Sequence, residues 1–207
     1  SENASEWSKH FIQTADIVFE TADFQSGGDF YNGGEGWRTI GTEASSFLGL
    51  YDGGGHTISG LFINRPTNDM QGMFGYADSG SIIRNLGLIN INVKGRTYVG
   101  GLFGLFSGTV NNCYAVGIVS STDFVGGLIG LNSGTVSGCY AECMVSGFSN
   151  LGGLVGYDTF GSVSNSYAMG SVSGTPPTNN YAGGLVGQSN GGSVSNCYAA
   201  GVVSGIS

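Results

Sequence analysis

Charged residues are scarce in this sequence of 207 residues, and several protein classes are excluded by what else is missing. Only 10% of the residues are Asp, Glu, Lys or Arg, where about 25% is usual. Proline occurs 3 times and glycine shows no period of three, which excludes collagen. No apolar run approaches the roughly 18 residues that a membrane-spanning helix needs. Four cysteines without a Cys-x-x-Cys pair indicate neither a disulfide-dense scaffold nor a zinc or redox motif.

Basic residues are the rarer charged class, with 6 against 14 acidic residues and a net charge of −8. This balance argues against nucleic acids and anionic membrane surfaces as partners, because both bind basic patches. No Lys or Arg follows Arg96, and only Asp123, Glu142 and Asp158 carry charge beyond it. A surface with so little charge predicts contact with something other than water.

Glycine is abundant instead, with 40 residues, and it marks an internal repeat. The first clear block reads Gly-Thr-Val-Asn-Asn-Cys-Tyr-Ala-Val-Gly-Ile-Val-Ser over residues 108–120. Equivalent blocks begin at Gly134, Gly161 and Gly192, at offsets of 26, 27 and 31 residues. The pattern Gly-Gly-Leu-x-Gly precedes each of the four blocks.

The repeat predicts an all-β fold. Each unit contains short β-branched runs between Gly and Asn residues, shows no helical periodicity and cannot bury its own apolar side chains. Stacking the units does bury them, which predicts a right-handed parallel β-helix (a β-solenoid) of roughly six coils of about 26 residues.

The two ends of the sequence differ. Residues 1–45 are less repetitive and hold both tryptophans and most of the acidic residues. We expect them to form an N-terminal capping segment on one continuous solenoid domain of residues 46–207. No comparable cap follows Ser204. Either the sequence was cut inside a longer solenoid, or an uncapped C-terminal coil is available for strand addition.

The repeat columns indicate which side chains point inward. The residue equivalent to Ala115 is Ala in all four blocks, and the residue equivalent to Val119 is Val in all four. These two positions lie on the same side of the strand, so that side is predicted to face the core. The alternate positions include Glu142 and are predicted to face outward. Val110 has the wrong parity for one straight strand, so we expect a corner near Asn111 and Asn112, because Asn tolerates such corners.

The Gly-Gly-Leu-x-Gly pattern followed by Gly-x-Val/Ile-x-Asn-Cys-Tyr-Ala-x-Gly-x-Val resembles the GLUG-motif repeats of microbial surface proteins. The resemblance covers residues 98–207. Residues 37–41, Phe47 and residues 51–61 look like the segment that often leads into such repeats, and residues 11–17 are more weakly similar to the strand that usually precedes it. It implies an extracellular β-solenoid of adhesins, large surface proteins or regions that flank metalloproteases, and it implies no catalytic residues. The zinc motif of such proteases, HExxH, is absent, since His10 and His56 are the only histidines.

The outward positions form a candidate contact face. The tyrosines of successive repeats are expected to stack about 4.8 Å apart, and the outward positions beside them are mostly apolar. Three interpretations stay open: contact with another subunit, contact with sugar rings, or a ladder that only stabilises the coil. The candidate residues are Tyr114, Tyr140, Tyr167, Tyr198, Val116, Ile118, Met144, Met169 and Val202.

The remaining candidates concern modification rather than catalysis. Cys113, Cys139, Cys143 and Cys197 are expected to be buried free thiols, with a bridge within or between chains as the alternative. Asn3 begins the one glycosylation-type sequon. We expect no catalytic, metal or cofactor site, because the three acids of the repeat region lie on different columns and the Asp-Gly-Gly-Gly-His loop at residues 52–56 offers too few ligands.

These observations predict a non-enzymatic structural protein of the cell surface or extracellular space, secreted with its signal peptide removed. We expect it to self-associate through low-charge solenoid faces and the uncapped C-terminal coil into a filament, sheath or surface layer. Its main partner is then a second copy of itself. The alternative is an adhesin stalk or fragment that binds a glycan or a host surface protein.

Overall fold

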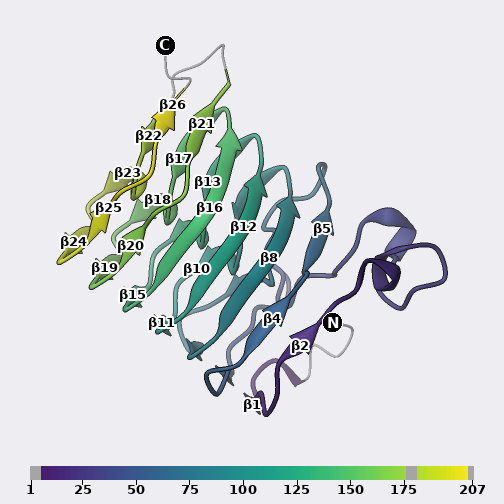
Figure 1. Ribbon diagram of the computed structural model, residues 1–207. Coiled ribbons are helices and arrows are strands. Elements are labelled where there is room, and N and C mark those ends of the chain that lie inside the picture. Colours follow the sequence, from purple (N-terminus) through teal and green to yellow (C-terminus); the bar gives the residue numbers. More distant parts are fainter. Residues whose placement is uncertain (1–5, 176–180, 205–207) are drawn as a thin grey trace.

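The computed structural model describes residues 6–175 and 181–204, which wind into a β-solenoid (Figure 1). Short parallel strands from successive coils stack into four sheets that enclose the core. The seven-stranded sheet contains, in order, β1 (His10–Ile12), β3 (Leu50–Asp52), β7 (Ile82–Arg84), β11 (Thr109–Asn111), β15 (Thr135–Ser137), β19 (Ser162–Ser164) and β24 (Ser193–Ser195).

The ten-stranded sheet lies next along each coil and carries the longest strands. It contains β2 (Ile17–Val18), β4 (Thr57–Ser59), β8 (Gly87–Lys94), β12 (Tyr114–Ser120), β16 (Tyr140–Gly147), β20 (Tyr167–Ala168) and β25 (Tyr198–Ala199), with β5 (Phe62–Asn64), β21 (Val172–Gly174) and β26 (Val203–Ser204) beside them.

Two smaller sheets complete the coil. The four-stranded sheet contains β9 (Thr97–Gly100), β13 (Asp123–Gly126), β17 (Ser149–Gly152) and β22 (Ala182–Gly183). The five-stranded sheet contains β6 (Phe74–Ala77), β10 (Phe103–Phe106), β14 (Ile129–Asn132), β18 (Val155–Thr159) and β23 (Val186–Asn190). These five strands correspond to about five complete turns. The predicted all-β parallel β-helix is confirmed, and its right-handed sense stays a prediction.

The core consists of the columns that the repeat indicated. Ala115, Ala141 and Ala168 are fully buried, as are the valines four positions further along the chain. Small side chains at these positions let facing sheets approach, and stacked leucines and phenylalanines fill the rest of the interior. The inward-facing assignment is therefore confirmed for these coils.

A corner separates the seven-stranded from the ten-stranded sheet, as the sequence predicted. Asn85, Asn112, Asn165 and Asn196 stand at this corner with φ between 50° and 54°, and Gly138 takes the same place with φ of 63°. Asn enters this left-handed region more readily than most residues, and Gly enters it without steric cost.

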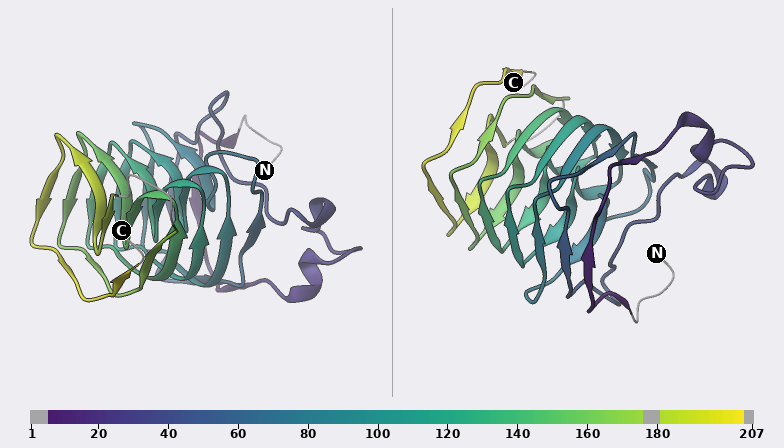
Figure 2. Two further views of the ribbon diagram at one scale, coloured as in Figure 1. Left: turned by 90° about the horizontal axis from the view of Figure 1, so that it is seen from above. Right: turned by 60° about the horizontal axis from the view of Figure 1, so that its bottom comes forward.

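The N-terminal segment contributes to the solenoid itself. β1 pairs in parallel with β3, and β2 pairs with β4, so coil pairing begins at His10. After β2 the chain leaves the stack in an excursion with two short 3-10 helices, η2 (Thr21–Phe24) and η3 (Asn32–Gly34), which projects beyond the coils in Figure 2. The division at residue 45 stays a prediction.

An aromatic cluster holds this excursion together. Phe19 contacts Phe24, Phe30 and Trp37 with ring centroids 5.0 to 5.8 Å apart, and Phe24 reaches Phe62 of β5 at 5.7 Å. The helices in the described part of the chain are all too short to cross a membrane.

Candidate functional site

The tyrosine ladder lies on the outer face of the ten-stranded sheet. Each tyrosine begins its strand directly after the corner, so in-register pairing places the rings one coil apart. The centroid distances are 4.6 Å for Tyr114 and Tyr140, 4.8 Å for Tyr140 and Tyr167, and 5.0 Å for Tyr167 and Tyr198, with interplanar angles of 6° or less. The coil spacing therefore imposes a nearly parallel stack.

The structure brings all nine predicted contact residues together on this face. Met144 is 55% exposed, and Ile118, Met169, Val202 and Tyr198 are exposed as well. Val116 and the other three tyrosines are half-buried. This surface is called the tyrosine face below. Its role in contact with another molecule stays a prediction.

The two central tyrosines of the ladder have raised pKa values. Burial raises the pKa of Tyr140, and the neighbouring Tyr114 and Tyr167 raise it further, because ionised rings repel one another at this spacing. Burial is also the main cause of the raised pKa of Tyr167. Ionisation of Tyr140 and Tyr167 is therefore disfavoured at the centre of the tyrosine face.

All four cysteines are free thiols in the structure. Cys113, Cys139 and Cys143 are fully buried, whereas Cys197 is half-buried. The Cys143 thiol donates to the Ala115 and Gly127 carbonyl oxygens at 3.4 and 3.5 Å. Burial raises the pKa of Cys139 to about 11 and that of Cys143 to about 12, so these thiols are poor nucleophiles.

The other two candidates from the sequence are the glycosylation sequon at Asn3 and the loop at residues 52–56. Asn3 lies outside the described residues. The loop from Asp52 to His56 is a turn in which the Gly54 N–H donates to Asp52 Oδ1 at 3.0 Å, and the same carboxylate pairs with Arg84 at 2.8 Å. Within the described residues, His, Cys, Asp and Glu side chains nowhere gather in threes that could hold a metal ion.

The structure also contains a polar cavity that sequence reasoning missed. It has a volume of about 510 Å³ and lies between Trp7, the segment 38–43 and the loop before β6. Its walls come from three segments that are separated in the sequence and lie outside the clear repeats, so no spacing pattern connects them. The lining residues are Trp7, Arg38, Thr39, Gly41, Thr42, Glu43, Arg65, Asn68, Asp69, Met70 and Gln71.

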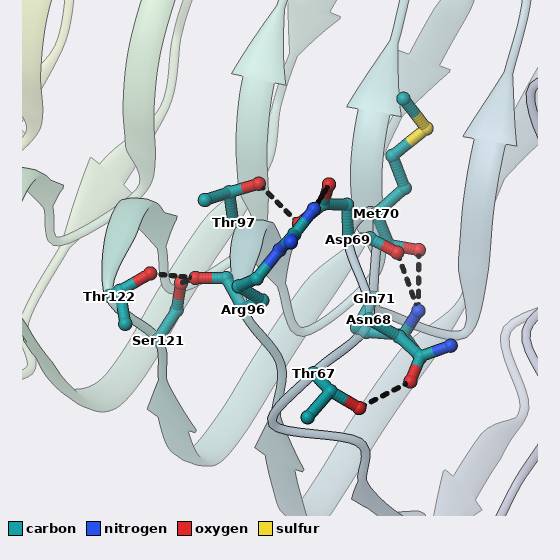
Figure 3. Close-up of polar contacts among 9 residues, drawn as sticks. All are labelled: Thr67, Asn68, Asp69, Met70, Gln71, Arg96, Thr97, Ser121 and Thr122. Carbon is teal, nitrogen blue, oxygen red and sulfur yellow. Dashed lines mark hydrogen bonds and ion pairs between the residues drawn. The ribbon is translucent and has the colours of Figure 1, made fainter.

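Ion pairs hold two charged side chains of the cavity walls, Arg65 and Asp69, in place. Arg65 Nη1 contacts Glu35 Oε2 at 2.6 Å, and its Nε donates to the Trp37 carbonyl at 3.1 Å. Asp69 pairs with Arg96 and accepts from Thr97 Oγ1 at 2.6 Å (Figure 3). The hydrogen bond from Arg96 is the main reason why the pKa of Asp69 is lowered.

Comparisons with known proteins agree with the fold. Residues 178–204 match the family described as the GLUG motif, which confirms the resemblance seen in the sequence. The chain is 38% identical over 96 residues to halomucin of Haloquadratum walsbyi, covering 45% of this chain and 1% of halomucin. It is 40% identical over 83 residues to a "Putative Gly-rich membrane protein" of Evansella cellulosilytica, covering 39% of this chain and 10% of that protein.

A solved structure has a similar fold. It is described as a "putative immunoglobulin A1 protease" from Bacteroides ovatus, and it superposes with a TM-score of 0.68 at 19% sequence identity. The match covers 96% of this chain and 61% of that one. At this identity the likeness concerns the fold alone.

Proposed function

Because the chain is a β-solenoid of GLUG-motif repeats, we propose that it is a non-enzymatic structural protein of the cell surface whose copies associate through the tyrosine face. The names of the two relatives, a halomucin and a Gly-rich membrane protein, support a place at the cell surface. This chain spans 1% and 10% of their lengths, so the proposal concerns this solenoid and not a whole protein of that size.

The low charge of the tyrosine face carries the proposal. Of the three acidic residues after Arg96, Asp158 is fully buried and Asp123 accepts hydrogen bonds from Asn150 and from the Phe124 N–H. Glu142 is the one charged side chain among the exposed groups of β12, β16, β20 and β25. Covering this surface with an identical one is favourable, because it removes apolar area from water and desolvates few charged groups.

A second contact in this proposal involves the coil that contains β24, β25 and β26. Val194 is 48% exposed and Val203 37% exposed there, whereas Val163 and Val172, their equivalents one coil earlier, are buried. Core-type side chains and parallel strands on this coil suit pairing with a further coil, whether of the same chain or of a second copy. Lateral and end-to-end contacts together give a filament, a sheath or a surface layer.

Sedimentation velocity over a range of protein concentrations tests the proposal, with electron microscopy of the concentrated samples. We expect the sedimentation coefficient to rise with concentration. Met144→Lys places a charge at the centre of the tyrosine face and should keep the protein monomeric. Thr135→Lys is the matched control, because Thr135 is exposed on the seven-stranded sheet instead.

Two results would overturn the proposal. The first is a wild-type protein that stays monomeric at every concentration. The second is equal association of the Met144→Lys and Thr135→Lys variants, which would place the contact elsewhere. Two further variants, Tyr140→Ser and Tyr167→Ser, distinguish a contact role of the tyrosine ladder from a purely stabilising role. If they lose folding stability but still associate, the ladder only stabilises the coil.

A further inference from the structure

We propose that the polar cavity binds a neutral, hydroxyl-rich ring, the pyranose unit of a carbohydrate. This site is distinct from the tyrosine face and does not depend on self-association. The volume of about 510 Å³ falls within the range of roughly 300–1,000 Å³ that is usual for small-molecule sites.

The composition of the walls suits a sugar ring. Trp7 supplies an indole, whose apolar surface matches the C–H faces of a pyranose. Asn68 and Gln71 supply planar amides, and Thr39 and Thr42 supply hydroxyl groups. Amides and hydroxyls both donate and accept hydrogen bonds, as sugar hydroxyls require.

The charges of the cavity are compensated, which selects against charged ligands. The Arg65 guanidinium is paired with Glu35, and the Asp69 carboxylate is paired with Arg96. The two further charged groups of the wall, Arg38 and Glu43, have opposite signs. A phosphate or a metal cation would find no excess of the opposite charge here, whereas a neutral polyol needs none.

Two polar atoms in the walls lack a partner. Among the described residues, only four buried side-chain oxygen or nitrogen atoms form no hydrogen bond, and two of them, Thr39 Oγ1 and Gln71 Oε1, belong to this cavity. Gln71 is 4% exposed. A buried acceptor without a donor destabilises the protein, and native structures rarely keep one without a reason. A small turn of the Thr39 side chain toward the cavity would let a sugar hydroxyl satisfy its Oγ1, whereas the Gln71 amide is held by its own hydrogen bonds.

The loop that carries Gln71 is held in place before any ligand arrives. The Gln71 amide nitrogen donates to the Asp69 and Met70 carbonyl oxygens at 2.6 and 3.3 Å (Figure 3). The Met70 and Gln71 N–H groups donate to the Thr97 and Tyr98 carbonyls of β9 at 2.9 and 3.1 Å. A loop docked in this way loses little conformational entropy on binding.

Binding should be measured by isothermal titration calorimetry with neutral hexoses and their oligosaccharides, alongside sialylated and sulfated oligosaccharides. Intrinsic fluorescence gives a second readout, because the chain has only two tryptophans and Trp7 lines the cavity. We expect at least one neutral saccharide to bind with a Kd below about 1 mM, and the charged saccharides to bind at least tenfold more weakly.

Two variants locate the site. Gln71→Leu removes the buried amide and should weaken binding at least tenfold, provided that the variant keeps the wild-type melting temperature within a few degrees. Asn68→Ala changes an exposed side chain, keeps the fold and should weaken binding about fivefold. Thr135→Ala, on β15 four strands along the seven-stranded sheet from β1, is the control and should bind like the wild type.

Three results would overturn the inference: no neutral saccharide binds, charged saccharides bind as tightly as neutral ones, or Asn68→Ala binds with wild-type affinity. Met144→Lys should bind saccharide normally, and Asn68→Ala should still associate, so failure of the sugar site and failure of self-association are separable.

Discussion

The ring of Tyr114 lies directly over Gly87, its register partner in β8, so closely that a Cβ atom on Gly87 would stand 2.2 Å from Tyr114 Cζ. Glycine therefore makes room for the first ring of the tyrosine ladder. Gly87→Ala should push this ring aside and weaken its stacking on Tyr140, which has a centroid distance of 4.6 Å. We expect a loss of about 1 kcal/mol in the free energy of unfolding, measured by chemical denaturation.

Gly80→Ala is the control for this substitution. A Cβ atom there would meet only Leu48, at the ordinary contact distance of 3.6 Å, so the change should stay within about 0.5 kcal/mol. In the double variant Gly87→Ala/Tyr114→Ala, the methyl group added at residue 87 should no longer lower the free energy of unfolding relative to Tyr114→Ala alone, because the ring that it meets is gone. An unchanged cost without the ring would show that the methyl group collides with something else.

The corner column allows a second test. Asn165 has a φ of 50° and accepts from Asn196 Nδ2 at 3.4 Å, while Gly138 occupies the same corner one coil earlier. Asn165→Gly should therefore change the free energy of unfolding by less than about 0.5 kcal/mol, whereas Asn165→Ala should cost about 1–2 kcal/mol, because a Cβ without a local hydrogen bond is strained at positive φ. Equal stability of the two variants, measured by urea denaturation, would contradict this account.

The repeat explains why so much of the coil could be predicted. Ala115 and its equivalents recur in register, so one column defines the inner side of a whole sheet, and the change of parity between Val110 and Ala115 locates the corner. The tyrosine stack follows from the same register. These features depend on residues that lie one coil apart, which a single sequence already aligns.

The polar cavity and the N-terminal excursion could not be predicted in this way. Trp7, Arg38 and Gln71 come from three segments outside the clear repeats, so no spacing pattern in the sequence connects them. The burial of Asp158 was equally hidden, since its register partners are Asn132 and Ser189 rather than apolar residues. Where the equivalent residues of successive coils differ in polarity, the sequence does not indicate whether that position faces the core or the solvent.

The buried thiols predict a loss of stability at alkaline pH. Cys143 has a pKa of about 12 in the folded protein, against the usual 9.0. Above pH 9 the unfolded chain releases this proton while the folded chain keeps it, so the folded state binds more protons and stability falls as the pH rises toward 12. We expect a loss of about 1 kcal/mol per buried thiol between pH 8 and pH 10.

The variant Cys143→Ala should show a shallower decline, measured by urea denaturation at pH 8, 9 and 10. A thiol-specific reagent supplies the companion measurement at pH 8. Cys197 should react rapidly in the folded protein, and the three buried thiols should react only at the rate of unfolding. Rapid reaction of more than one thiol, or identical alkaline profiles for the wild type and the variant, would refute the assignment.

The buried carboxyl group of Asp158 is a position where a substitution should stabilise the protein rather than destabilise it. Asp158 is fully buried, its Oδ1 accepts from Asn132 Nδ2 at 2.6 Å, and its Oδ2 forms no hydrogen bond. Burial raises the pKa of Asp158 above its usual value of 3.8, and the side chains of Asn132 and Ser189 oppose this shift. As the pH rises above 3.8, the unfolded chain loses this proton first, so the native state binds more protons and stability falls with rising pH until the folded carboxyl ionises too.

Asp158→Asn removes this penalty and keeps an acceptor for Asn132. We expect the variant to be more stable than the wild type by about 1 kcal/mol at pH 7, with the difference shrinking as the pH is lowered to 4, as measured by chemical denaturation at several pH values. Asp29→Asn, at an exposed position of the excursion, is the control and should change little. If Asp158→Asn lowered stability at pH 7, the contacts of the carboxylate with Asn132 and Ser189 would outweigh its burial. An advantage that persisted unchanged at pH 4 would show that the gain does not come from ionisation of Asp158.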